Sequence, residues 1–536
     1  MTFNLINERW IPVRRLDGAQ EIIAPWQVTD DIGSNPIVSL DANRPDFNGA
    51  LIQFLIGLVQ TTMAPKRDRN WMAGFTEPPG TDKMKNAFER VSHAFNLDDD
   101  MPRFMQDFEL GEAKSNQIDK LLVEIPGDET IKDNADHFIK RDSVKRMCLA
   151  CSAMALFTLQ TNAPTGGKGY RTSLRGGGPL TTIIMGDTLW QTIWLNVLNE
   201  SDFLDNCGNS SLTDDAAIFP WMGPTRTSEK NQLTTPEDVH PAHMFWGMPR
   251  RIVLKFDSAE NENCDVCGCD SNNLVTSYVA KNYGTNYEGG WRHTLTPYGT
   301  NKQNVLIPRH GNPGGITFRH WLGLVQNDNV NRNEPATVVH TFRARHKELE
   351  NKQSMQLWAF GYDFDNMKAR CWYEGKMPLI NVDDDIRENY ESVIERLIKT
   401  SELVANNVRK YVKEAMFRRP GDVKGDFSFI DNRFWNGTEP EFYAILEKLR
   451  ISLSDGADTG DDAIVGIKLQ WLDTLFQTGE QLFDEYSQSN QMDVADPKRI
   501  ALAHRNLRKF NQKNNKQIIK ILDLPDKKML TSFAFT

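Results

Sequence analysis

The feature that most constrains how this chain can fold is a pair of C-x2-C motifs that lie far apart in the sequence. Cys148 and Cys151 form the first pair, Cys264 and Cys267 form the second, and 112 residues separate the two pairs. Two such pairs supply the four thiolates of a tetrahedral zinc site, and this site would clip distant segments together. Because four protein ligands leave no open coordination position, the zinc would be structural and not catalytic.

Other interpretations of the cysteines stay open at this point. Cys148 and Cys151 also fit a helix on which both are buried as small apolar residues. Cys269, beside the second pair, is an alternative ligand, and His240 and His243 are further candidates although their spacing matches no strong metal motif. The chain has seven cysteines, an odd number, which argues against a disulfide framework.

The hydrophobic pattern changes near residue 380. Before it, short apolar runs alternate with Gly/Pro/Asn clusters and a few helical stretches, which indicates an α+β domain over residues 1–380. After it come four long amphipathic segments, at roughly 383–417, 439–454, 461–487 and 496–522. We therefore predict a C-terminal four-helix bundle over residues 381–536.

Local signals place some of the helix boundaries. Thr438 and Glu441 form a capping box that predicts the start of the second bundle helix, and Asp496 followed by Pro497 predicts the start of the fourth. In the first domain, the apolar window 50–63 is shorter than the roughly 20 residues that span a bilayer, so we expect a buried helix there.

A cationic glycine-rich stretch, TGGKGYRTSLRGGG at 165–178, follows the first cysteine pair. Glycines let a backbone approach nucleic acid closely, and basic side chains contact phosphates or a groove. A nucleotide-binding P-loop is excluded because Asn162 and Gly169 stand where that motif needs Gly and Ser/Thr. A glycine-rich turn between core elements is the alternative. The basic residues of this stretch are Lys168, Arg171 and Arg175.

Basic residues gather in two further places. Residues 498–528 hold ten Lys/Arg against Asp523 and Asp526, a local charge of +8, whereas the whole chain has a charge of 62 − 72 = −10. We therefore expect a surface that binds a polyanion. The other run, just before the first cysteine pair, consists of Lys140, Arg141, Lys145 and Arg146.

The sequence offers no catalytic constellation. It contains no G-x-S-x-G or H-E-x-x-H motif and no HD dipeptide, so we predict that the protein is not an enzyme. Its first residues show no charged segment followed by a long apolar stretch, and we expect a cytoplasmic location.

Several stretches together resemble one known family. They are NLINERWIPVRRLDG near the start, CLACSAMALFTLQTNAPTGGKGYRTSLRGGGPLTT at 148–182, CDVCGCDSNN at 264–273 and GYDFDNMKAR at 361–370. In order and spacing they are similar to the CasA family, the large subunits of type I-E CRISPR surveillance complexes (Cascade). The resemblance covers essentially the whole chain.

This resemblance implies a non-catalytic DNA-recognition subunit. Members of the family find the short protospacer-adjacent motif (PAM) from the minor groove and open the adjacent duplex so that guide RNA can pair and an R-loop forms. They also hold the displaced strand and help to recruit the helicase-nuclease. The minor groove distinguishes base pairs poorly, so such a reader should accept several related motifs while guide pairing supplies most of the discrimination.

The resemblance also implies roles for individual residues. The family's glycine loop falls on Gly166, Gly167, Lys168 and Gly169, where Lys168 replaces a glycine. Its minor-groove lysine falls on Asn282, with Lys281 adjacent, and either residue can serve. Its duplex-splitting wedge falls on Met367 beside Asn366, and an apolar side chain suits unstacking.

Two more assignments complete the implied site. An aromatic residue of the loop before the first cysteine pair falls on Phe138, with His137 as the alternative. The family's four zinc ligands match Cys148, Cys151, Cys264 and Cys267.

Two rival functions stay open. One is a free-standing, zinc-stabilised nucleic-acid-binding protein outside any CRISPR assembly, and the other is a nuclease whose site the motifs do not reveal. Association with guide RNA and other subunits would separate both rivals from the Cascade hypothesis.

Overall fold

The structure is a computed structural model of the chain. It describes residues 2–125, 143–208, 211–345, 355–365, 367–423, 425, 427–454, 460–487 and 496–525, except for the side chains of 257–261 and 460–461. The described chain forms two compact units. Unit 1 contains residues 1–312 and 335–376, and unit 2 contains residues 313–334 and 377–536.

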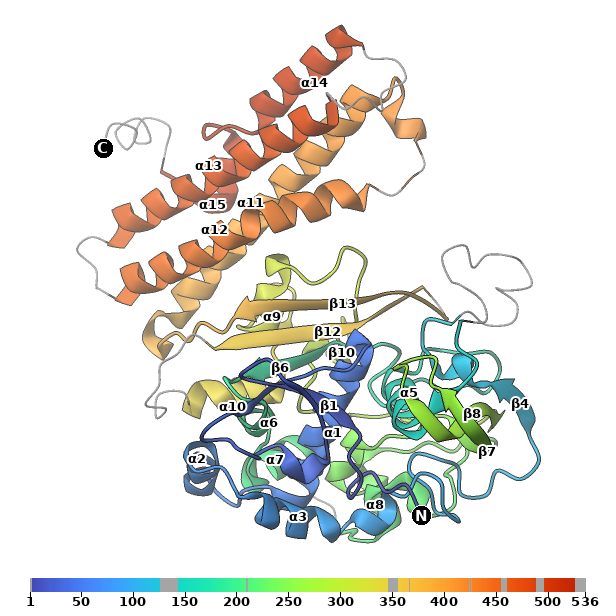
Figure 1. Cartoon of the computed structure of the whole chain (residues 1–536). Helices are drawn as coiled ribbons and strands as arrows, with labels where there is room; N and C mark the ends of the chain where they lie inside the picture. The colour runs from blue at the N-terminus through green and yellow to red at the C-terminus, as the bar shows by residue number, and fades with distance from the viewer. Residues whose placement is uncertain are drawn as a thin grey trace. The chain divides into compact units, whose positions relative to one another are not determined.

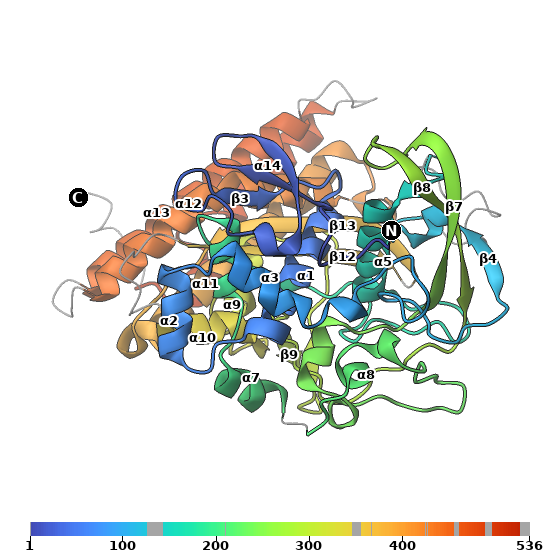
Figure 2. The same cartoon turned by 60° about the horizontal axis from the view of Figure 1, so that its bottom comes forward.

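Unit 1 combines small sheets with short helices (Figures 1 and 2). Its strands are β1 (Ile11–Arg15), β2 (Gln20–Ile23), β3 (Ile37–Leu40), β4 (Lys114–Gln117), β5 (Met147–Cys148), β6 (Thr181–Met185), β7 (Arg251–Asn263), β8 (Asp270–Lys281), β9 (Tyr298–Thr300), β10 (Leu306–Pro308), β12 (Gln356–Asp365) and β13 (Lys368–Pro378), of which β13 ends just past the unit boundary. The sheet orders are β2-β1-β3, β13-β12-β6 and β4-β8-β5, with β7 also paired to β8. The predicted α+β class is confirmed.

Helix α1 is the longest helix described in unit 1 and packs against several of the others. The helices of this unit are α1 (Pro45–Met63), α2 (Asp68–Thr76), α3 (Thr81–Glu89), α5 (Leu149–Asn162), α6 (Leu189–Leu195), α7 (Glu200–Cys207), α8 (Asp215–Ile218) and α10 (Thr337–Arg345). Helix α1 packs against α3, α5 and α6, and it is buried along most of its length. The apolar window 50–63 is thus a buried helix, as predicted.

An aromatic cluster around Phe54 of α1 forms the centre of this core. The Phe54 ring meets five other rings at centroid distances of 5.4 to 6.0 Å and interplanar angles of 79° to 88°, an edge-to-face geometry that favours aromatic pairs. The five partners come from segments far apart in the chain, so this cluster joins them: Trp10, Phe95, Phe104, Phe157 and Trp246.

Unit 2 contains the predicted C-terminal helical region. Its elements are α9 (Trp321–Leu324), β11 (Asn333–Glu334), α11 (Asp384–Met416), α12 (Ser428–Ser454), α13 (Gly460–Ser487), α14 (Pro497–Phe510) and α15 (Lys516–Leu522). Helix α11 contacts α12, α13, α14 and α15 and is the central helix of the unit. The indole of Trp471 on α13 donates hydrogen bonds to Leu397 O (3.2 Å) and Ser401 Oγ (3.1 Å) on α11.

The segment 313–334, which the sequence analysis placed in the first domain, packs with the bundle. The ring of Phe318 stacks on Phe442 at 4.3 Å and lies edge-to-face with Trp435 at 5.1 Å and Trp471 at 5.8 Å. Burial of this aromatic residue in the bundle core explains why the segment belongs to unit 2.

The predicted start of the second bundle helix is wrong. Helix α12 begins at Ser428, 11 residues before the predicted start at 439, and contains Pro440. The Thr438 hydroxyl, expected to cap a helix, donates instead to Phe434 O (2.8 Å) one turn earlier. The apolar residues Phe434 and Trp435 are buried in the core, and their burial extends the helix past the local capping signal.

The fourth predicted segment, 496–522, is two helices. Asp496 accepts hydrogen bonds from Lys498 N and Arg499 N (both 3.1 Å), so the predicted N-cap is confirmed. The helix ends at Phe510, and a new helix starts after Asn515, whose side chain accepts from Gln517 N (2.8 Å).

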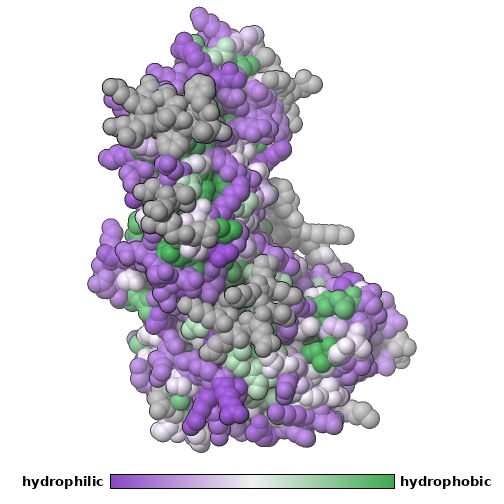
Figure 3. Space-filling view, turned by 90° about the vertical axis from the view of Figure 1, so that its left-hand side faces the viewer, coloured by the Kyte–Doolittle hydropathy of each residue, from purple (hydrophilic) through white to green (hydrophobic). Residues whose placement is uncertain are grey.

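The face of the molecule drawn in Figure 3 is mainly polar where its residues are described. Figure 3 shows a face on which hydrophilic residues dominate and hydrophobic patches are small. Among the described residues, no helix combines the length and the apolar character that crossing a membrane requires.

Replacing Phe54 tests the aromatic core. Phe54→Ala should lower the free energy of unfolding by about 3 to 5 kcal/mol, because it leaves a cavity among five rings. Leu16→Ala is the control, since Leu16 is 65% exposed and its loss should cost less than about 0.5 kcal/mol. Urea denaturation followed by tryptophan fluorescence measures both. Equal stability of the two variants would contradict a core centred on Phe54.

Candidate metal centre and nucleic-acid interface

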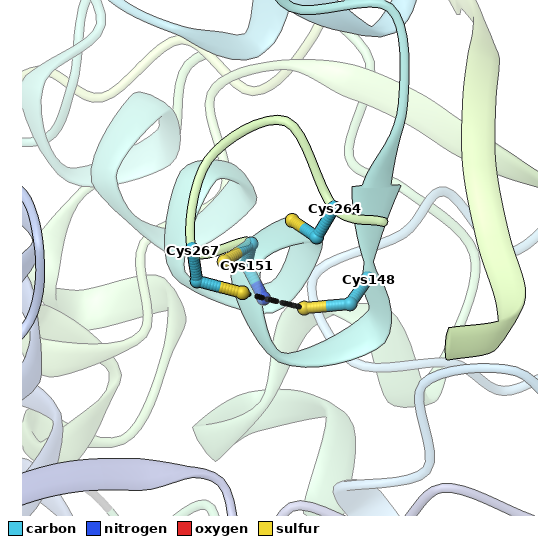
Figure 4. Close-up of side chains that lie close together, drawn as sticks. All are labelled: Cys148, Cys151, Cys264 and Cys267. Atoms are coloured by element: carbon cyan, nitrogen blue, oxygen red, sulfur yellow. Dashed lines mark hydrogen bonds between the residues drawn. The ribbon is translucent and has the colours of Figure 1, made fainter. Parts of the chain in front are cut away.

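The two cysteine pairs are brought together by β8. Cys148 is the second residue of β5 and lies opposite Leu274 of β8, and Cys151 is in the first turn of α5. Cys264 and Cys267 belong to the turn that joins β7 to β8. Figure 4 shows the four side chains pointing toward one another, with the Cys151 amide donating to Cys148 Sγ (3.4 Å).

Hydrogen bonds of Asp265, two through its carboxylate and one through its backbone amide, hold the two pairs in this arrangement. Asp265, between the second pair of cysteines, accepts hydrogen bonds from Lys145 N (2.7 Å) and Arg146 N (3.0 Å), and its own amide donates to Arg146 O (3.1 Å). The turn is thereby attached to the segment before Cys148. Asp265 belongs to no sequence motif, although an acidic residue directly after Cys264 is a visible signal.

The geometry of the four sulfurs fits one metal ion. All four lie within 4.8 Å of one another, and Cys148 Sγ is 3.7 Å from Cys267 Sγ. A tetrahedral site with metal–sulfur bonds of about 2.3 Å has sulfurs about 3.8 Å apart. The set of four leaves no open coordination position, so a bound ion would be structural.

The four thiols shift one another's pKa values in opposite directions: the pKa values of Cys264 and Cys267 are lowered, whereas those of Cys148 and Cys151 are raised. Hydrogen bonds from the thiols of Cys148 and Cys151 lower the pKa of Cys264 to about 6, and the same two thiols lower the pKa of Cys267. Thiolates are the form of cysteine that binds metal. Cys269 Sγ is 3.1 Å from Cys267 Sγ but does not belong to the group whose members all lie within 4.8 Å.

The two candidate histidines do not join this cluster. His243 is 1% exposed and makes hydrogen bonds with Ala217 O (3.1 Å) and the Tyr287 hydroxyl (3.0 Å), and burial lowers its pKa to about 4. His240 lies at the start of a short helical turn, where its Nδ1 accepts from Ala242 N (3.1 Å). Both side chains thus have structural roles.

The glycine loop 165–178 follows α5 and docks on the end of β8. Tyr283 N donates to Gly169 O (2.7 Å), and the Asn282 amide donates to Lys168 O (2.7 Å). Gly169 has a φ of +81°, and a side chain there would approach Asn282 and Tyr283 to 3.0 Å. The structure therefore brings together the glycine loop and the 281–282 segment, which are more than 100 residues apart.

The candidate groove residues at this junction have different surroundings. Asn282 uses its amide to hold the loop, whereas the Lys281 ammonium donates to Leu110 O. Both side chains are partly exposed. A lysine ammonium has three donors, so Lys281 keeps donors for a further acceptor.

The basic residues of the loop are not equivalent. Lys168 is exposed, and Arg171 is partly buried with its Nε donating to Ser228 Oγ (2.9 Å). Arg175 is only 4% exposed, and its guanidinium donates to Gln53 Oε1, Thr181 Oγ1 and Thr296 Oγ1. A side chain enclosed by core partners cannot reach a phosphate, so we correct the interpretation of Arg175 from a DNA contact to a structural residue.

The candidate wedge Met367 lies at the tip of the β12–β13 hairpin and is 54% exposed. The hairpin is braced near its tip by Arg370, which donates to both carboxylate oxygens of buried Asp363 (3.0 and 2.7 Å). The hairpin also packs on the end of the glycine loop, since a side chain at Gly178 would lie 2.6 Å from Phe364. Asn366, Phe138 and His137 lie outside the described residues.

The C-terminal basic cluster is weaker than its charge count suggests. Arg499, Arg508 and Lys513 form ion pairs with acidic residues of unit 2. Three exposed basic residues share one face of α14, because they follow one another at seven- and four-residue steps: Lys498, Arg505 and Lys509. Lys527 and Lys528 lie outside the described residues, as do Lys140 and Arg141.

Known proteins share this architecture. Cse1 from Thermobifida fusca is 15% identical with a TM-score of 0.70, and the alignment covers 97% of this chain and 98% of that one. CasA from Thermus thermophilus is 13% identical with a TM-score of 0.68, covering 95% and 99%. A chain of a CRISPR RNA-guided surveillance complex is 16% identical with a TM-score of 0.65, covering 95% and 99%.

At these identities the structural likeness establishes the fold. The family is shown by sequence, because the family described as CRISPR-associated protein Cse1 matches residues 4–482. This match spans most of both units, and it agrees with the resemblance found in the sequence. The chain therefore belongs to the Cse1 family of CRISPR-associated proteins, also called CasA.

Proposed function

We propose that this protein is the non-catalytic DNA-recognition subunit of a type I-E, crRNA-guided CRISPR surveillance complex. In this role it reads the PAM from the minor groove, promotes duplex opening and R-loop formation, and helps to recruit the helicase-nuclease. Its partners are the target duplex with its displaced strand, the crRNA-containing subunits and the helicase-nuclease. Family membership supports the assembly, and so does the structural likeness to a chain of an RNA-guided surveillance complex.

The observation that carries the DNA-reading role is the docking of the glycine loop on β8. This contact gathers exposed Lys168, partly exposed Lys281 and Asn282, and Gly167 on one part of unit 1. A side chain added at Gly167 would meet no atom within 4 Å, so the loop backbone is open at this point. Backbone amides, one amide side chain and two lysines suit the acceptor-rich floor of the minor groove and its flanking phosphates.

The hairpin tip supports the duplex-opening role. Met367 is an exposed apolar side chain on a hairpin that is braced at Asp363 and packs on the same glycine loop. Proteins that kink or unstack DNA insert apolar side chains between base steps. An exposed apolar side chain on a hairpin braced at Asp363 and Arg370 is suited to this task.

We propose zinc as the ion held by Cys148, Cys151, Cys264 and Cys267. Four thiolates in tetrahedral geometry are typical of structural zinc sites. Bound there, the ion would join the start of α5 to the turn before β8 without taking part in chemistry. The acidic partner Asp265 would keep the turn aligned through its contacts with Lys145 and Arg146.

The proposed function is tested by leaving the chain out. The reconstituted complex should bind targets from a randomised PAM library selectively when this chain is present, and lose most of that selectivity without it. The chain purified from cells should also carry guide RNA and other subunits, which neither rival function requires. Equal PAM selection with and without the chain would refute the proposal, and metal-dependent cleavage of DNA by the isolated chain would favour the nuclease rival.

A wedge variant tests the opening step. Met367→Ala should slow duplex opening by roughly 10-fold, because unstacking a base step costs a few kcal/mol and about 1.4 kcal/mol changes a rate tenfold. A fluorescent base analogue beside the PAM reports opening. On a target with a pre-opened bubble the variant should match the wild type, and an equal loss on both substrates would remove Met367 from the wedge role.

Serine substitutions test the zinc site. Cys148→Ser or Cys264→Ser should remove most of the bound zinc and lower the melting temperature, because metal binding is coupled to folding. Cys371→Ser is the matched control, and Cys269→Ser should also retain zinc because its sulfur is outside the group of four. Elemental analysis of the purified complex measures zinc per chain. An unchanged zinc content in both cluster variants would disprove the assignment.

A further inference from the structure

Tyr170 is an exposed aromatic residue within the glycine loop. Its side chain is 39% exposed, two residues after exposed Lys168. The Tyr170 amide donates to Gly167 O (3.0 Å), so the residue closes a tight turn at the tip of the loop. Neither the sequence motifs nor the proposed function above uses this ring.

The ring is held from one side by a buried arginine. The Arg250 guanidinium carbon lies 4.9 Å from the Tyr170 ring centroid, a cation–π contact. Arg250 is only 8% exposed and is anchored through its backbone to Gln160 of α5 and through Nη2 to Pro164 O. Burial lowers the Arg250 pKa to about 10, so the guanidinium stays charged at neutral pH.

Two further details suit this pair to a ligand. A side chain at Gly166 would collide with Tyr170 Cβ at 2.2 Å, so glycine at this position lets the ring fold against Arg250. Arg250 Nη1 is buried and has no hydrogen-bond partner, although unpaired buried donors are costly. The guanidinium lies over one face of the Tyr170 ring, so this cation–π contact leaves the opposite face of the ring unused.

We propose that the Tyr170 ring, backed by Arg250, is a stacking platform for a DNA base that becomes unpaired beside the PAM. This inference rests on the proposed function and adds to it an aromatic side chain that contacts a base. Lys168 would contact phosphate, whereas Tyr170 would contact the flat face of a base. An aromatic side chain can stack on any of the four bases. Such a contact suits the opening of the duplex beside the PAM, because there the guide RNA and not the protein selects the sequence.

The test compares Tyr170→Ala, Tyr170→Phe and Lys168→Ala in the reconstituted complex. Affinity for a PAM-containing target is measured over a range of salt concentrations. Tyr170→Ala should bind about 5- to 150-fold more weakly, the range for losing one base–aromatic stack. Tyr170→Phe should bind within about twofold of the wild type because it keeps the ring. Tyr170→Ala should leave the salt slope unchanged, whereas Lys168→Ala should reduce it by about one.

Three results would overturn the platform. They are wild-type affinity of Tyr170→Ala, an equal loss in Tyr170→Phe, and a salt slope of Tyr170→Ala that falls as it does for Lys168→Ala. A loss of affinity accompanied by a lower melting temperature would also count against it, since it would make Tyr170 a structural residue. A control complex that lacks this chain separates the two proposals. If that complex still selects PAM-containing targets, the proposed function is refuted. If it loses this selection but Tyr170→Ala behaves like the wild type, only the stacking platform is refuted.

Discussion

The meeting of the first cysteine pair with the turn before β8 is the constraint on which the rest of the site depends. Helix α5 leaves this junction at Leu149 and β8 leaves it at Asp270, and both run toward the glycine loop, where Tyr283 N donates to Gly169 O. The 14 residues of α5 span about 21 Å at roughly 1.5 Å per residue. The cysteine junction anchors the start of α5 and the start of β8. It therefore fixes where the glycine loop and the end of β8 meet, at the other end of these two elements.

The glycine loop serves packing as much as surface access. Gly166 makes room for Tyr170, Gly169 for Asn282 and Tyr283, and Gly178 for the β12–β13 hairpin, whereas a side chain at Gly167 would have open space. The loop is thus fitted to the end of β8 at one point and to the hairpin at another. These close contacts set the relative positions of the glycine loop, the end of β8 and the β12–β13 hairpin.

Charge counts alone misjudged which cations face solvent. Arg175 and Lys168 lie in the same stretch of sequence, yet Arg175 is bonded inside the core while Lys168 is exposed. In the bundle, Arg508 pairs with Glu480 of another helix. Such pairing and burial depend on residues distant in sequence. The contact between Tyr170 and Arg250 cannot be recognised from local sequence either, because the two residues are 80 positions apart.

Features that local spacing controls can be recognised in the sequence alone. These are the two cysteine pairs, the helical period of the bundle, the cap at Asp496 and the presence of a basic glycine-rich loop. Which residues those features meet depends on the three-dimensional fold, in which Phe318 enters the bundle core, Thr438 lies inside a helix and Arg175 is buried among core partners. The physical reason is that capping and periodicity act over a few residues, whereas burial depends on packing between distant segments.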